Sequence, residues 1–158
     1  MSNVRIGTIE VEGSDPFVAK TTEAIHLLNK TSAFWDVRRY LGKILEADRS
    51  GMRAYDTPPT YQVGQQTWVS HVIWYASTIA HDTYHSYLYH MAGYKSANVP
   101  DDAWTGAGAE KQCNEFQLRV LGELKKFNDS EASRFITYLQ GLMGSGTDYY
   151  SNYASRNW

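Results

Sequence analysis

The chain has 158 residues and a formal net charge of −2, a length that suits one domain with a core of its own. No basic run is longer than a pair, which argues against nucleic acid as the main partner because phosphate binding needs a basic surface. No apolar run approaches the ~18 residues that would span a bilayer, so no membrane partner is expected. Cys113 is the only cysteine, which excludes an intrachain disulfide. The N-terminus shows no basic region followed by an apolar stretch, so we expect a cytoplasmic protein, with export by a route that reads no cleavable signal left open.

The first third of the chain predicts one strand and two helices. Apolar residues alternate from Val4 to Val11, which is typical of a strand. Asp15 and Pro16 then suit the start of a helix that runs to about Asn29. Apolar residues at helical spacing predict a second helix over residues 32–47.

The rest of the chain predicts two short strands followed by three helices. The strands lie on either side of Pro58 and Pro59, which places them at an edge or a bend because proline cannot donate to a sheet ladder. The helices are expected over about 68–91, 107–127 and 130–142. The order β–α–α–β–β–α–α–α predicts an α+β fold in a single domain, residues 1–143, with a polar, tyrosine-rich tail at 144–158.

Three histidines and an aspartate lie close together in STIAHDTYHSYLYH, residues 77–90. His81 and His85 are four residues apart, so on a helix their side chains lie on one face and converge. Two imidazoles placed in this way can occupy adjacent corners of a tetrahedral zinc site. Asp82 follows the first histidine, on the side that can lean over a metal-bound water. The pattern H-D-x-x-H is one methylene shorter than the H-E-x-x-H metallopeptidase motif.

A catalytic zinc site needs a third protein ligand and an open position for water. Glu110 is the best candidate, because it begins the next predicted helix after a loop long enough to turn the chain back. Glu115 is the competitor, but it lies about 140° around the helix from Glu110, so only one of the two should face the metal. His71 and His90 lie too far along the helix or on another face, and they are not expected to be ligands.

The region from Met52 to Leu124 resembles the gluzincins, which are thermolysin-like zinc peptidases with H-E-x-x-H on one helix and a glutamate ligand on the next. The compact repressor-cleaving and radiation-response branch carries E-x-x-A-N-x-F-A on the second helix. EKQCNEFQ at residues 110–117 is similar to it, with Cys113 in place of the alanine. The resemblance implies a zincin-like fold: a small N-terminal sheet with an edge strand, a long helix that carries the active site, and C-terminal helices.

The same resemblance implies the roles of individual residues. His81, His85 and Glu110 would hold one zinc ion, and Asn114 would orient a ligand from the second shell. The run PPTYQVGQQT is similar to the edge strand along which gluzincins lay an extended substrate. Its expected substrate-binding residues are Thr60, Tyr61, Gln62 and Val63.

The resemblance also implies a mechanism, the hydrolysis of a peptide or protein substrate. Zinc lowers the pKa of a bound water to roughly 7, and Asp82 would accept its proton as general base and return it to the leaving amine. Aspartate has the chemistry of the family's glutamate with a shorter reach.

Two other functions fit the residues. A catalytically weak or inactive peptidase-like scaffold would bind a partner through its tyrosine-rich surface, and Asp82 is the feature that favours it. The dipeptide His-Asp also occurs in metal-dependent phosphohydrolases, which have an all-helical fold, so strand content separates them from the peptidase. Cys113 is interpreted as a small buried residue rather than a nucleophile, because no base partner is evident.

Overall fold

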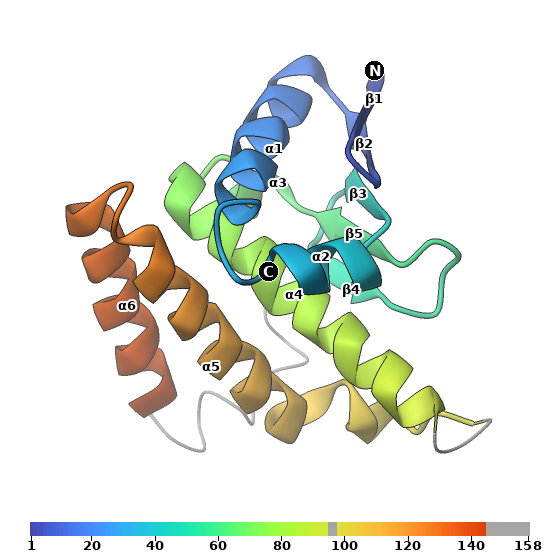
Figure 1. Ribbon diagram of the computed structural model, residues 1–158. Helices are drawn as coiled ribbons and strands as arrows, with labels where there is room; N and C mark the ends of the chain where they lie inside the picture. The colour runs from blue at the N-terminus through green and yellow to red at the C-terminus, as the bar shows by residue number, and fades with distance from the viewer. Residues whose placement is uncertain (95–97, 145–158) are drawn as a thin grey trace.

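A computed structural model describes residues 1–94 and 98–144, and it confirms an α+β fold (Figure 1). One mixed sheet and a set of helices make up this part of the chain. The strands are β1 (Ser2–Ile6), β2 (Ile9–Gly13), β3 (Lys43–Glu46), β4 (Gly51–Arg53) and β5 (Thr60–Val63). The helices are α1 (Asp15–Leu28), α2 (Phe34–Tyr40), α3 (Gln65–Trp68), α4 (Val72–Gly93), α5 (Gly106–Leu124) and α6 (Asp129–Gly144), with a single 3₁₀ turn at Asp101–Ala103.

The predicted first strand is a hairpin of two strands. β1 and β2 pair antiparallel with Ile6 opposite Ile9, so Gly7 and Thr8 form a two-residue turn. Gly7 has a φ of +60°, and a glycine at the first central position is what a type II′ hairpin turn requires. The apolar alternation continues through both strands, which is why the sequence reads as one strand.

The second predicted helix is wrong in its last third. α2 ends at Tyr40, and residues 43–46 form β3 instead of a helical turn. β3 pairs in parallel with β2 on one side and with β5 on the other, and Ile44 between them is fully buried. A short apolar run fits either a helix or a buried strand, and here the two ladders decide the outcome.

The strand order β1-β2-β3-β5-β4 corrects the prediction of an edge strand at Thr60–Val63. β5 is an inner strand, paired with β3 in parallel and with β4 antiparallel. Pro58 and Pro59 precede β5, so they leave its ladders intact. The edge on this side of the sheet is the short strand β4, whereas β1 forms the opposite edge.

α4 is the central helix of the molecule (Figure 1). It contacts α1, α2, α5, α6 and the β4–β5 end of the sheet. Its apolar side chains join one core with those of the sheet and the flanking helices. No helix in residues 1–94 and 98–144 is long and apolar enough to cross a membrane. The predicted tail, apart from Gly144, lies outside the described residues.

Candidate metal site

Two polar helix faces meet where α4 packs against α5. On α4, Ser77, His81 and His85 recur every four residues, so they lie on one face. The facing stripe on α5 consists of Glu110, Cys113, Asn114 and Gln117, whose spacing of three or four residues places them on one face. The side chains of both stripes are buried.

The Glu110 carboxylate lies between the two histidines. Both of its oxygens are 3.2 Å from Nε2 of His81, and Oε2 is also 3.2 Å from Nε2 of His85. Glu110 itself is fully buried. The structure therefore brings the three predicted ligands together around one point.

Gln117 fixes the tautomer of His81. The Ser77 hydroxyl donates to the carbonyl of Trp74, so its oxygen accepts from Nε2 of Gln117, 2.9 Å away. This leaves the carbonyl oxygen of Gln117 directed at Nδ1 of His81, at 2.9 Å. Because an amide oxygen can only accept, Nδ1 carries the proton, and Nε2 presents either a lone pair or a second proton to Glu110.

His85 is oriented by the backbone. Its Nδ1 lies 2.6 Å from the carbonyl oxygen of Trp104, which again can only accept. The Trp104 ring packs edge-on against Tyr55 and Tyr89, which anchors the segment after the 3₁₀ turn. Protein partners of this kind on the far nitrogen are characteristic of histidines that ligate metals.

Two Nε2 atoms and a carboxylate thus face one another in a buried space. Three acceptor groups repel unless protons or a cation lie between them. Burial lowers the pKa of His81, but the charge of Glu110 and its hydrogen bond outweigh burial and raise that pKa to about 9. Burial raises the pKa of Glu110, yet the two histidines outweigh it and hold the pKa well below its usual range. The site is built to hold positive charge.

The separations in this cluster are compatible with a bound metal ion. Ligands bonded at 2.0–2.1 Å in a tetrahedron are about 3.3 Å apart, and the observed separations from Glu110 to the two Nε2 atoms are 3.2 Å. Oε1 of Glu110 is buried, and it lies 3.2 Å from Nε2 of His81. Two imidazoles with one carboxylate are also a ligand set that catalytic zinc sites use.

Asp82 is partly exposed beside the cluster. Burial of its carboxyl raises the pKa above the ordinary value, and the charge of Glu110 acts in the same direction. The two histidines oppose this shift, as does a hydrogen bond from the Tyr61 hydroxyl. Tyr61 comes from β5 and is almost fully buried, with its hydroxyl 3.3 Å from Oγ1 of Thr78. A carboxylate with a raised pKa next to a cation site suits a proton acceptor.

Cys113 is buried, as predicted, but it also belongs to the cluster. Its Sγ and one ring nitrogen from each of His81 and His85 all lie within 4.8 Å of one another. It follows Glu110 by three residues on α5, so the two side chains emerge from the same face. Burial raises the pKa of the thiol well above its ordinary value, and the charges of Glu110 and Asp82 raise it further.

The remaining site predictions have mixed outcomes. Asn114 is buried on the correct face of α5, and its role as an orienting residue stays a prediction. Glu115 is exposed, as expected of the competitor that faces away. Substrate binding by Thr60, Tyr61, Gln62 and Val63 also stays a prediction, although their strand β5 is not an edge of the sheet.

Sequence reasoning missed Gln117, Trp104 and the contact of Tyr61 with Asp82. Gln117 carried a signal, since it is seven residues after Glu110 and therefore on the same face of the predicted helix. The positions of the Trp104 carbonyl and of Tyr61 depend on the tertiary fold, so no local sequence pattern predicts them.

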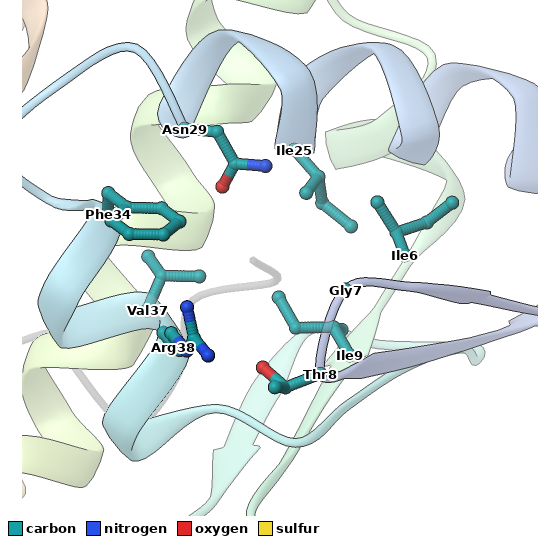
Figure 2. Close-up of a pocket in the computed structure, with 9 residues that line it drawn as sticks. All are labelled: Ile6, Gly7, Thr8, Ile9, Ile25, Asn29, Phe34, Val37 and Arg38. Carbon is teal, nitrogen blue, oxygen red and sulfur yellow. The ribbon is translucent and has the colours of Figure 1, made fainter.

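A separate pocket of about 330 Å³ lies between the hairpin turn, α1 and α2 (Figure 2). Ile9, Ile25 and Val37 supply apolar walls, while Asn29 and Arg38 place polar groups beside them. None of its lining residues belongs to the cluster of His81, His85, Glu110 and Cys113.

Neither the comparison with protein-family models nor the searches of curated proteins and of solved structures found a match to this chain. Function must therefore be inferred from the contacts of the site itself.

Proposed function

We propose that this protein is a zinc-dependent peptidase of zincin-like fold, with His81, His85 and Glu110 as metal ligands. The observation that carries the proposal is the convergence of two correctly oriented Nε2 atoms and a buried carboxylate at 3.2 Å. Both rings direct Nδ1 to an acceptor, Gln117 for His81 and Trp104 for His85, so each ring turns Nε2 toward Glu110. A metal ion would replace the proton that His81 otherwise shares with Glu110.

When bound, zinc would polarise a substrate carbonyl and make a water nucleophilic near neutral pH. The protein supplies the proton transfer. Asp82 accepts a proton at its carboxylate and returns it to the departing amine, and its raised pKa favours that task near neutral pH. Tyr61 on β5 acts on the same carboxyl by lowering its pKa.

The substrate strand is assigned to β4 in place of β5. β4 is an edge strand of the sheet, and it contacts α4, the helix that carries His81. An extended peptide can add to such an edge through main-chain hydrogen bonds. Gly51, Met52 and Arg53 are therefore the proposed substrate-binding residues.

The alternative of a catalytically weak, peptidase-like binding protein is favoured by one observation. Asp82 stands where the peptidase motif has a glutamate, and its side chain reaches less far toward a metal-bound water. The phosphohydrolase alternative loses its support, because it requires an all-helical fold and this chain has a five-stranded sheet.

Cleavage of a library of unstructured peptides by the zinc-loaded protein separates the peptidase from the scaffold. We expect new peptide N-termini by mass spectrometry, and a loss of about a hundredfold or more in rate for Asp82→Asn because the base is removed. Asp129→Asn, at an exposed aspartate on α6, is the matched control and should retain the rate. Zinc-loaded protein that cleaves nothing, either as the wild type or as Asp82→Glu, would establish the scaffold.

A further inference from the structure

α5 brings a fourth donor atom to the proposed zinc site. Sγ of Cys113 lies within 4.8 Å of one ring nitrogen of each histidine, and the residue is fully buried. Glu110 lies one helical turn before it, with its carboxylate 3.2 Å from Nε2 of each histidine. The cluster therefore contains four potential ligands, of which the catalytic arrangement uses three.

The distances are those of a site that needs a small adjustment. Sulfur bonded to zinc at 2.3 Å and nitrogen at 2.0–2.1 Å are about 3.5 Å apart in a tetrahedron. The separations among Sγ and the two histidine nitrogens do not exceed 4.8 Å, so the sulfur has to move closer by about 1 Å to bind the same metal. Cys113 is the only cysteine of the chain, so no other residue can supply a thiolate ligand.

We propose that Cys113 is the fourth protein ligand of the metal and that it closes the site in the resting protein. The inference rests on the proposed zinc site at His81, His85 and Glu110. The thiol loses its proton to bulk water as the sulfur–metal bond forms, so no oxidant or reductant is involved. A metal with four protein ligands has no position for water, which is the difference between structural and catalytic zinc sites.

Cys113 would then regulate the same centre. Hydrolysis requires the sulfur to leave the fourth position so that water can enter it. Loss of the thiol should therefore weaken metal binding and raise the rate of peptide cleavage in the zinc-loaded protein. If Cys113 only fills space, its replacement would not weaken metal binding and raise the cleavage rate at the same time.

Cobalt substitution tests the proposal without relying on activity. Co²⁺ is added to chelator-treated wild-type protein, and its absorption spectrum is compared with those of Cys113→Ser, which is close in size, and Cys113→Ala. A thiolate ligand gives an intense sulfur-to-cobalt charge-transfer band in the near ultraviolet, whereas nitrogen and oxygen ligands give only weak visible bands. We expect the intense band in the wild type, its loss in both variants, and a zinc Kd that is about tenfold or more weaker in the variants.

The outcomes separate the two proposals. Stoichiometric Co²⁺ binding with visible bands but no charge-transfer band would overturn the role of Cys113 and leave the three-ligand site standing. Failure to bind Co²⁺ or Zn²⁺ at all would overturn both. Retention of the intense band in Cys113→Ser, where no cysteine remains, would show that it arises elsewhere and would also overturn the proposal.

Discussion

At the scale of residues, the two histidines are oriented by partners of different kinds. His81 depends on a side chain, Gln117, whose own amide is held by Ser77. His85 depends on the main chain at Trp104, which no substitution removes directly. Only the first of these orienting contacts can therefore be deleted cleanly by mutation.

Replacement of Gln117 by leucine removes the acceptor of the His81 Nδ1 proton. The ring then lacks the contact that selects its tautomer, and we expect the zinc Kd to weaken by about 10- to 100-fold. Competition with a chromophoric chelator measures it. Gln112→Leu, at an exposed glutamine on the same helix, should leave the Kd unchanged. Equal affinities in all three proteins would show that Gln117 does not orient the ligand.

Tyr61→Phe tests the environment of Asp82. The hydrogen bond from Tyr61 lowers the pKa of this carboxyl, so its loss should raise that pKa further. If Asp82 is the base, the acidic limb of the pH–rate profile for peptide cleavage should move to higher pH. The phenyl ring retains the packing of a residue that is 1% exposed. An unshifted limb with an intact fold would contradict the assigned base.

At the scale of elements, the helices were predicted better than the strands. α1, α5 and α6 follow from amphipathic periodicity, because each buries one stripe of side chains against the same core, whereas the central α4 is buried on most of its sides. The strands depend on ladders between distant segments. Residues 43–46 became β3 only because β2 and β5 lie on either side of them.

The candidate site divides in the same way. His81, Asp82 and His85 were found from spacing within one helix, and Glu110 from the start of the next. Gln117 could have been found from the α5 stripe. The edge strand was wrong because strand order is a property of the whole sheet, and the choice between β4 and β5 cannot be read from either segment alone.

The hairpin turn offers a prediction at this scale. Gly7→Ala places a Cβ at a φ of +60°, which should cost about 1 kcal/mol of unfolding free energy in urea denaturation. No atom lies within 4 Å of the added Cβ, so the cost is that of the backbone alone. Gly51→Ala, also in open space but without a positive φ, is the control and should not destabilise the protein. Equal stabilities of the two variants would contradict the assigned turn.

At the scale of the whole molecule, the cluster links stability to pH. His81 has a folded pKa of about 9 and an ordinary value of 6.5, so its protonation stabilises the folded state. This contribution is fully present below pH 6.5 and is lost as the pH rises through 9. The urea concentration at the unfolding midpoint of chelator-treated protein should therefore decrease as the pH rises from 6.5 to 9.

Zinc should remove that dependence, because the cation takes the place of the proton beside Glu110. The zinc-loaded protein is expected to unfold at higher urea than the chelator-treated protein, and the difference should widen as the pH rises from 6.5 to 9. Glu110→Gln removes the charge that raises the pKa of His81, and it should flatten the pH dependence without added metal. A midpoint that is constant with pH in chelator-treated wild type would contradict the coupled cluster.

The most direct test of the account is a zinc titration of chelator-treated, tag-free protein with four chains in parallel: wild type, His85→Ala, Glu110→Gln and His90→Ala. His90 lies on the same helix and contacts the carbonyl of Ser86, so its variant controls for the loss of an imidazole. We predict one zinc per chain in the wild type and in His90→Ala, and a Kd at least about a hundredfold weaker in the other two because each loses a ligand. Absence of zinc binding in the wild type, or equal binding in all four, would contradict a metal centre at His81, His85 and Glu110.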